Sequence, residues 1–363
     1  MSAPGDRAQD LAAAVAEAAA RGTPLRIIGS GSKASLTDAA YDHGAAPFRW
    51  LSVADHRGII DYQPEELVVT ARAGTPLGEL EALLASRGQL LPFEPPRLRG
   101  AGTLGGAVAA GLAGPARSWR GAVRDSVLGV ELANGRGERL RFGGQVMKNV
   151  AGYDVSRLQV GAFGTLGLLL SISVRLLPRP EAEQTRVFEL TASEALGRCR
   201  DWARQPLPLS GTCHHAGRLF VRLSGASAAV TAAAARLGGE AHADEGFWPA
   251  LRDHRHPFFE ATGEVLWRAV VPPAAPVTNA AALIGWGGAE RWHWRPPGDT
   301  SAAAEAAAAG GHARPFDGGF GYRDGPHLPE PERRLGARLR DAFDPERILN
   351  RNLGEAPEQD HAD

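Results

Sequence analysis

Cysteine is scarce in this sequence, and the shortage excludes two kinds of site. Cys199 and Cys213 are the only cysteines among the 363 residues. An iron–sulfur cluster is usually held by four cysteine thiolates, so this chain cannot hold one alone. Two thiols also provide no disulfide framework, which favours a reducing compartment. We therefore expect a cytoplasmic protein; peripheral attachment to the inner face of the cell membrane, through partner proteins, is the alternative.

Lysine is equally scarce. Of the 40 basic residues, only Lys33 and Lys148 are lysines, and the rest are arginines. A planar guanidinium and a compact ammonium differ in shape, so a lysine in an arginine-rich sequence can mark a place where arginine does not fit. Both lysines lie in glycine-rich segments, which directs attention to those segments.

Long apolar runs and a strong charge balance are also missing. No stretch reaches the ~18 apolar residues of a membrane span, and the longest, 167–177, is interrupted by Arg175. Asp10 and Glu17 interrupt the N-terminal apolar residues, which predicts an amphipathic helix rather than a signal peptide. The formal net charge is −1, so nothing indicates a nucleic-acid partner.

What is present predicts two domains of α+β structure. A length of 363 residues with 44% hydrophobic residues suits two globular domains. Pro178 and Pro180 mark a boundary, because two prolines so close together interrupt regular structure. We expect a first domain over residues 1–178 and a smaller α+β domain over 179–340.

The spacing of apolar residues and of turn residues predicts the individual elements. Helices are predicted over 8–21, 77–86, 226–237, 301–309 and 333–343. Strands are predicted over 24–28, 67–71, 127–132, 138–142, 168–176, 218–223 and 265–271. Thr75 is the expected N-cap of the second helix, with Pro76 at its first position. Asn134-Gly135 predicts a hairpin turn, and residues 286–297 are predicted as strand or loop.

Three glycine-rich segments carry the predicted chemistry. Residues 29–33, Gly-Ser-Gly-Ser-Lys, follow a strand, and successive N–H groups there could hold a pyrophosphate, with Lys33 adding charge. Residues 102–106, Gly-Thr-Leu-Gly-Gly, begin a predicted helix whose free N–H groups and dipole would favour phosphate. The third segment combines 148–154 with 161–167.

Each segment also has a purely structural interpretation. The first could be a tight turn, the second a place where a helix packs closely on a sheet, and the third a turn between strands. The first segment nearly fits a dinucleotide-binding pattern, but no acidic residue follows at the spacing that an NAD site needs. All three occurring in one order along the chain favours a common ligand over three separate turns.

Five stretches of sequence together indicate a family. They are the strand with its GSGSK loop, ELVVTARAGTPLGELEALLASRGQLLPFEPP, GTLGGAVAAGLAGP, VRDSVLGVEL and GGQVMKNVAGYDVSRLQVGAFGTLG. Over residues 24–180 the chain resembles the FAD-binding domain of the p-cresol methylhydroxylase/vanillyl-alcohol oxidase family. Within this family, the amino-acid sequence is most similar to the smaller FAD-binding (E) subunits of bacterial glycolate oxidases. The resemblance returns at FDPERILN, residues 343–350, so a C-terminal segment, 341–363, is expected to return to the first domain.

The resemblance implies where FAD binds. Phosphate contacts are expected from residues 28–33 and 102–106, adenosine contacts from 164–168 and Ile172, and a flank for the flavin from 92–96. The residues expected to contact FAD are Ile28, Gly29, Ser30, Gly31, Ser32, Lys33, Pro95, Gly102, Thr103, Leu104, Gly105, Gly106, Gly111, Lys148, Asn149, Gly152, Gly164, Thr165, Leu166, Gly167, Ile172 and Asn350. Valine at Gly105 or Gly106 is predicted to abolish FAD binding while the fold is retained.

Two departures from the family pattern limit what is implied. Many members attach FAD covalently through a histidine in the first loop, which here has none, so FAD is expected to be noncovalent. Catalytic relatives carry a histidine-rich H-G-D-G-N segment, which is also missing, so no catalytic residue is assigned. The pairs His214-His215 and His254-x-His256 are expected to be exposed or core residues rather than bases or metal ligands.

The implied function is that of an FAD-binding subunit of a glycolate (2-hydroxy acid) dehydrogenase complex. Glycolate would be oxidised to glyoxylate, and the electrons would pass to an iron–sulfur partner in a complex that also holds a sister FAD subunit. Two alternatives stay open: a stand-alone FAD-linked hydroxy-acid or sugar oxidase, and a scaffold subunit that has lost flavin.

Overall fold

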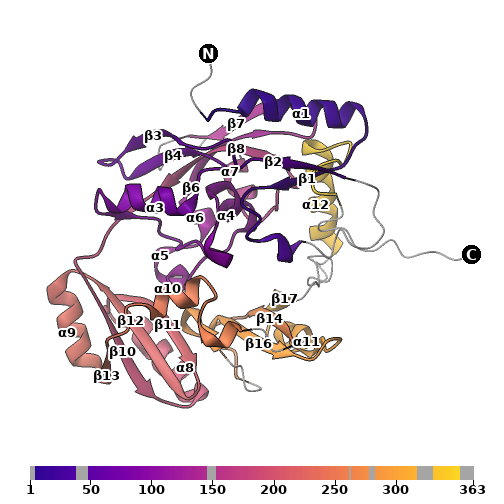
Figure 1. Cartoon of the computed structure of the whole chain (residues 1–363). Helices are drawn as coiled ribbons and strands as arrows, with labels where there is room; N and C mark the ends of the chain where they lie inside the picture. Colours follow the sequence, from indigo (N-terminus) through magenta and orange to yellow (C-terminus); the bar gives the residue numbers. More distant parts are fainter. Residues whose placement is uncertain are drawn as a thin grey trace, which may run out of the picture.

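The structure is a computed structural model that describes residues 5–37, 48–144, 153–260, 263–277, 283–316 and 330–351. Two sheet-based parts lie one above the other in Figure 1; the chain passes from the first to the second near residue 180 and is back beside the first part at its C-terminal helix. The mixture of helices and antiparallel sheets confirms the predicted α+β class. No described helix is both long enough and apolar enough to cross a membrane.

The first part is built on a five-stranded antiparallel sheet and a small parallel ribbon. The sheet order is β3 (Ile59–Gln63), β4 (Val68–Arg72), β8 (Leu168–Arg175), β6 (Val127–Ala133) and β7 (Arg139–Gly143). The ribbon pairs β1 (Leu25–Ile28) with β2 (Arg49–Ser52), and a short pair joins β5 (Gln89–Leu90) to β9 (Leu177–Pro178). The helices are α1 (Ala8–Ala20), α3 (Leu77–Ala85), α4 (Leu104–Ala110), α5 (Arg117–Arg120), α6 (Val123–Ser126) and α7 (Val155–Leu158), with short 3₁₀ turns at Ala34–Leu36 and Leu98–Gly100.

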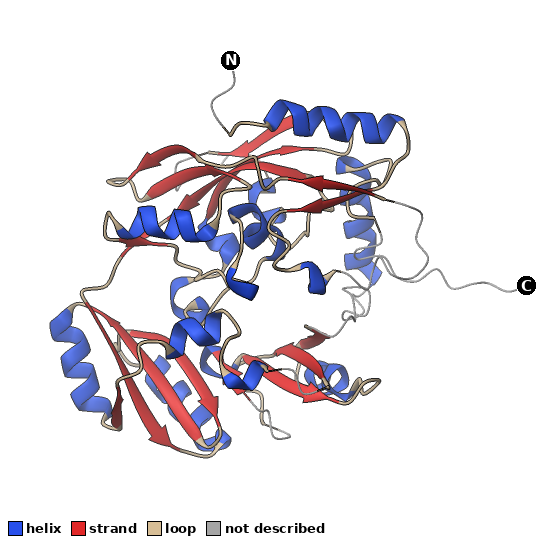
Figure 2. Ribbon diagram, in the orientation of Figure 1, coloured by secondary structure: helices blue, strands red, loops and turns tan. Residues whose placement is uncertain are grey.

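Helix α1 shows how the apolar pattern creates packing in this part. Leu11, Val15 and Ala18 recur at the spacing of one helical face, and all three are buried against β1 and β8. In Figure 2 the helix lies across the outer side of the first part. Strand β4 is buried along its whole length, as a central strand covered on both faces must be.

Two predictions about turns have different outcomes. The hairpin at Asn134 is confirmed: β6 pairs with β7, and the Asn134 side chain accepts hydrogen bonds from Arg136 N and Glu138 N at 3.0 Å each. The prediction that Thr75 caps α3 is wrong by one residue, because Pro76 occupies the N-cap position. Thr75 Oγ1 instead bonds to the backbone of Gly58, a partner that lies 17 residues away in the chain.

The second part is an eight-stranded antiparallel sheet with helices along it. Its order among the described residues is β13 (Glu240–His242), β10 (Ala182–Glu189), β12 (Arg218–Gly225), β11 (Leu209–His215), β15 (Leu283–Gly285), β16 (Glu290–Arg295), β14 (Val265–Val270) and β17 (His312–Pro315). The helices are α8 (Ala192–Ala203), α9 (Ser227–Leu237), α10 (Phe247–Arg252) and α11 (Ser301–Ala308), with 3₁₀ turns at Pro257–Phe259 and Trp286–Gly288.

Buried ion pairs connect the two parts. Glu94 of the first part accepts hydrogen bonds from Arg120, also in the first part, at 3.3 Å and from Arg222 of β12 at 2.8 Å. Asp253, which follows α10, accepts one from Arg97 N at 3.0 Å. Removing one partner would leave a buried charge unpaired, so these contacts hold the parts in one arrangement.

The end of the chain lies beside the first strand. Helix α12 (Glu330–Phe343) runs alongside the first part in Figure 1. Beyond it, Leu25 N donates to Ile348 O at 2.7 Å, and Asn350 N donates to Leu25 O at 2.9 Å. These bonds add residues 348–350 to the β1–β2 ribbon, which brings Asn350 to the point where β1 ends.

Candidate FAD site

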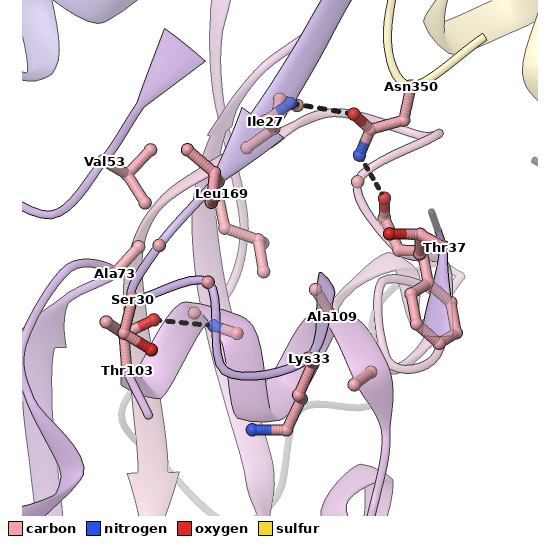
Figure 3. Close-up of a pocket in the computed structure, with 18 of the residues that line it drawn as sticks. Ile27, Ser30, Lys33, Thr37, Val53, Ala73, Thr103, Ala109, Leu169 and Asn350 are labelled. Carbon is pink, nitrogen blue, oxygen red and sulfur yellow. Dashed lines mark hydrogen bonds between the residues drawn. The ribbon is translucent and has the colours of Figure 1, made fainter. Parts of the chain in front are cut away.

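A pocket opens where β1 ends, between the ribbon, α4 and the turn before β8. Its lining combines apolar side chains with a few convergent polar groups, as is usual at cofactor sites. In Figure 3, Ile27, Ser30 and Lys33 face the same space as Thr103 and Ala109, and Asn350 closes one side. The residues that line it are Arg26, Ile27, Ile28, Gly29, Ser30, Gly31, Ser32, Lys33, Ala34, Thr37, Trp50, Val53, Ala73, Thr103, Gly105, Gly106, Ala109, Ala110, Phe163, Gly164, Gly167, Leu168, Leu169 and Asn350.

The first glycine-rich loop, residues 29–33, offers unpaired backbone N–H groups to this pocket. Within the described part of the chain, no group accepts a hydrogen bond from the N–H of any of these five residues. Gly31 has φ +73°, a conformation that glycine adopts without strain. Several N–H groups in such a turn form a concave site for an anion.

Lys33 places a half-buried cation beside that loop. Its Nζ donates to Pro96 O at 3.2 Å and lies next to Gly102 of the second loop. Burial lowers the pKa of Lys33 to about 8, an effect that the charge of Asp253 partly opposes. Because a bound phosphate would supply a negative charge nearby, it would favour the protonated form of this lysine.

The second glycine-rich loop, residues 102–106, differs from its prediction. The start of α4 was expected to offer free N–H groups, but they are paired within the protein: Leu104 N donates to Thr75 O at 2.9 Å, Gly105 N to Ala73 O at 2.8 Å, and Gly106 N to Thr103 Oγ1 at 3.1 Å. The sequence could not reveal this, because two of the three acceptors come from the turn that follows β4. Among the described residues, the N–H groups at 104–106 are therefore occupied, whereas those at 29–33 are not.

The glycines of the second loop have distinct surroundings. A Cβ atom on Gly105 would lie 2.7 Å from Ala73 Cβ and 2.9 Å from Ala73 O, so this glycine permits close packing of α4 on the sheet. A Cβ atom on Gly106 would meet only Thr103 Oγ1, at 3.1 Å, and Gly106 lines the pocket. A Cβ atom on Gly29 would lie 2.6 Å from Thr103 Oγ1, so the two loops touch there.

The third segment contributes through its second half. Gly164 and Gly167 line the pocket, and Asn350 connects this turn to β1. The Asn350 side chain accepts a hydrogen bond from Ile27 N at 2.8 Å and donates one to Phe163 O at 2.5 Å, as the dashed lines in Figure 3 show. Lys148, Asn149 and Gly152 lie outside the described residues.

Seven predicted contact residues do not line this pocket. Leu104 and Ile172 are fully buried in the core of the first part, and Leu166 is also buried. Gly111 ends α4 with φ +64°. The others are Pro95, Gly102 and Thr165. Their assignment as FAD contacts stays a prediction, and the packing of Leu104, Ile172 and Gly111 is sufficient to explain those residues.

Several lining residues were missed by the analysis of the sequence. Trp50 lies on β2, a strand that was not predicted, and Val53 and Phe163 lie in turns. The alternation in Arg49-Trp50-Leu51-Ser52 was the available signal, although four residues are a weak one. Ala109 and Ala110 do belong to the run of small residues that attracted attention.

Comparisons with known proteins decide the family. The FAD binding domain family matches residues 5–143. The glycolate oxidase subunit GlcE of Escherichia coli (strain K12) is 45% identical over 350 residues, which cover 95% of this chain and 96% of that protein. The chain belongs to the GlcE family of glycolate oxidase subunits. It is therefore an FAD-binding protein of an oxidoreductase family.

More distant relatives match shorter stretches of the chain, or the fold alone. The glycolate oxidase subunit GlcD of Bacillus subtilis (strain 168) is 34% identical over 127 residues, which cover 35% of this chain and 27% of that protein. A solved structure of alkyldihydroxyacetonephosphate synthase superposes with a TM-score of 0.67, covering 96% of this chain and 75% of that one at 14% identity. This likeness shows the fold: an FAD-binding domain of the p-cresol methylhydroxylase type, with a second α+β part.

The pocket fits the cofactor that the family binds. A row of unpaired N–H groups and the half-buried Lys33 suit a pyrophosphate. The apolar side chains Ile28, Val53 and Leu169 give the pocket dry walls for the rest of the molecule. Among the described residues, no group of three or more histidine, cysteine, aspartate or glutamate side chains could hold a metal ion.

Proposed function

We propose that this chain is the FAD-binding subunit of a glycolate dehydrogenase complex, which oxidises glycolate to glyoxylate. The observation that carries the proposal is the 45% identity to the GlcE subunit along nearly the whole of both chains, combined with the pocket between the glycine-rich loops. When bound, FAD supplies the hydride acceptor.

The residues of this chain bind and orient the cofactor. The N–H groups of residues 29–33 receive the pyrophosphate, Lys33 neutralises part of its charge, and Gly106 leaves room beside it. FAD is held without a covalent bond, because the first loop has serine and lysine where covalent members have histidine. Flavin fluorescence that remains with the protein band on a denaturing gel would contradict this.

The domain boundaries belong to the same proposal. We infer an FAD-binding domain over 1–178, a second domain over 179–340 and a returning segment over 341–363. The two separate main sheets, and the bonds from residues 348 and 350 to Leu25, support this division.

Glycolate oxidation and the onward transfer of electrons need partner subunits. Two buried, unlinked cysteines, Cys199 and Cys213, cannot ligate an iron–sulfur cluster, so electrons leave through an iron–sulfur subunit. A sister FAD subunit provides the groups for glycolate oxidation, since no catalytic histidine segment occurs here.

Turnover by the isolated chain tests the proposal. With FAD bound and an artificial electron acceptor present, the isolated chain should oxidise glycolate slowly or not at all, and addition of the partner subunits should restore turnover. Robust turnover by the isolated chain would favour a stand-alone oxidase. Purified chain that takes up no FAD at all would favour a flavin-free scaffold.

A further inference from the structure

A second cavity, of about 270 Å³, lies within the second part of the molecule, between α11 and the strands β14 and β16. In Figure 1, α11 lies beside these strands. Side chains alternate between the two faces of a sheet. Trp292 packs in a cluster with Leu98 and Ala110 of the first part, so its neighbours Arg291 and His293, which line the cavity, face the opposite side. The sheet therefore separates this cavity from the FAD pocket.

Small side chains on α11 leave the cavity open. Ala302, Ala306 and Ala309 recur on one face of this helix and line the cavity, and Val271 adds a further apolar wall. Leucine at the same positions of the helix would fill the space. The apolar walls suit a short hydrocarbon chain, whereas the groups that can bind a polar ligand lie mainly on β16.

His293 brings an unpaired imidazole to the cavity wall. Only 8% of this residue is exposed, and neither ring nitrogen has a hydrogen-bond partner within the described part of the chain. Burial, and then the charges of Arg295 and Arg291, lower the pKa of His293 to about 4, so the ring is neutral at pH 7. A neutral imidazole offers one N–H donor and one acceptor. A buried polar group without a partner costs free energy, which a ligand bonded to it would recover.

Arg291 adds a buried positive charge that no carboxylate balances. This residue is 6% exposed, and it donates to three backbone carbonyls: Pro276 O at 2.8 Å, Ala275 O at 2.6 Å and Gly288 O at 3.3 Å. A guanidinium has five N–H groups, so two remain for a ligand. Among the described residues no acidic side chain pairs with Arg291, and burial is what lowers its pKa.

Glu305 also lines the cavity, but its charge is already paired. Both of its carboxylate oxygens accept hydrogen bonds from Arg295 Nη2, at 3.2 Å each. Arg295 and Glu305 offset each other and His293 is neutral, so the charge of Arg291 is left without a counter-charge. One negative charge on a ligand would balance it, whereas a second would lie close to Glu305 and be repelled.

We propose that this cavity binds a small monocarboxylate with a short apolar chain. The carboxylate accepts hydrogen bonds from Arg291 and His293, and the chain lies against the alanines of α11. Neither the family match nor the glycine-rich loops assign a role to this cavity. The inference depends neither on FAD binding nor on glycolate being the substrate.

Butyrate is the probe, and butyramide, which has the same shape without the charge, is its neutral control. Calorimetric titration of the full chain, with and without FAD, measures both dissociation constants. The wild-type protein should bind butyrate at least about tenfold more tightly than butyramide, because bonds between charged groups are the stronger ones. Butyrate affinity should be the same in the presence and absence of FAD, because the two sites lie on opposite sides of the sheet.

Two variants test whether butyrate occupies this cavity. His293→Leu keeps a buried side chain of similar size and removes the hydrogen bond, so butyrate affinity should fall by about tenfold. Ala309→Leu fills the cavity and should lower the affinity by at least as much. Ala307→Leu is the matched control, because Ala307 is exposed on the same helix and does not line the cavity. Its butyrate affinity should equal that of the wild type.

No butyrate binding by the wild-type protein at concentrations up to about 10 mM would overturn the proposal, as would equal affinities for butyrate and butyramide. Wild-type butyrate affinity in both His293→Leu and Ala309→Leu would also overturn it. Competition between butyrate and FAD would place butyrate in the FAD pocket and would have the same consequence. Circular dichroism checks that the variants fold, and the comparison with butyramide needs no variant. Glycolate turnover, which tests the proposed function, leaves these binding constants unaffected.

Discussion

The two glycine-rich loops that face the pocket have similar composition and opposite hydrogen-bonding states. In residues 29–33, no N–H group has a partner within the described residues. In residues 104–106, every N–H group is bonded to the turn after β4 or to Thr103. Both loops line the same pocket and touch where Gly29 meets Thr103.

The difference separates two uses of glycine. The first loop keeps its N–H groups available for a ligand, whereas the second uses Gly105 to bring α4 against Ala73. We therefore propose that the second loop shapes the pocket and that the first loop binds the phosphates. Phosphate binding at the start of α4 would require those paired N–H groups to give up their present acceptors.

The largest expected effect is on folding, in Gly105→Val. The new side chain would overlap Ala73 Cβ and the Ala73 carbonyl, so either α4 or β4 must move. The free energy of unfolding should fall by about 3 kcal/mol or more. Urea denaturation measures this change, and a variant as stable as the wild type would remove the packing role of Gly105. This expectation differs from the prediction made from the sequence, that the fold would be retained, and the denaturation experiment decides between them.

Gly106→Val should separate binding from folding. Its side chain would enter the pocket and meet only the Thr103 hydroxyl, so stability should stay within about 1 kcal/mol of the wild type. FAD affinity should fall by about tenfold to a hundredfold, because the pocket would be overfilled. Calorimetric titration of flavin-free protein with FAD is the measurement. Normal affinity in the folded variant would place FAD away from α4.

Lys33→Ala should weaken FAD binding by a comparable or smaller factor. Loss of a charge-assisted contact to the pyrophosphate costs about 1.5–3 kcal/mol, or roughly tenfold to a hundredfold in affinity. Lys33→Arg should also lose affinity, since the longer, planar guanidinium must be placed where Nζ already lies beside Pro96 O and Gly102. If all three proteins quench FAD fluorescence with one dissociation constant, Lys33 only anchors Pro96.

The pH dependence of binding gives the smallest effect and has a defined sign. Lys33 has a pKa of about 8 in the free protein, so above pH 8 FAD must bind together with a proton. FAD affinity should fall by up to about tenfold between pH 7 and pH 9, and Lys33→Ala should flatten this change. An FAD affinity that does not change with pH would contradict the position of Lys33 beside the phosphates.

The same pKa sets how Lys33 affects the stability of the FAD-free fold. Between pH 8 and 10.5 this lysine is protonated more often in the unfolded chain than in the folded chain, so the contribution of Lys33 to the free energy of unfolding rises with pH.

Local signals predicted the elements around the pocket well. The strand ending in the first loop was predicted over 24–28 and is observed as Leu25–Ile28, and the helix predicted over 77–86 is observed as Leu77–Ala85. Both depend on apolar spacing and on turn residues that are close in sequence. Helix α8 was missed although Thr191 and Glu194 form a capping box that the sequence contains.

Contacts between residues far apart in the sequence could not be predicted from local patterns. The acceptors that occupy the N–H groups of Leu104 and Gly105 belong to Thr75 and Ala73, which lie 29 and 32 residues earlier in the sequence. The neutral, aromatic surroundings of His254 likewise come from Trp292 and Phe316, which only folding brings to it. From sequence, this histidine could be read only as an exposed or core residue.

Hydrogen–deuterium exchange of the full chain, with and without FAD, tests the difference between the loops most directly. Amides with no partner exchange rapidly, whereas amides in stable hydrogen bonds are protected. In the FAD-free protein, peptides covering residues 29–33 should exchange fast and those covering 104–107 slowly. FAD should protect the first set strongly and change the second little. New protection at 104–107 with none at 29–33 would contradict the assignment of phosphate binding to the first loop.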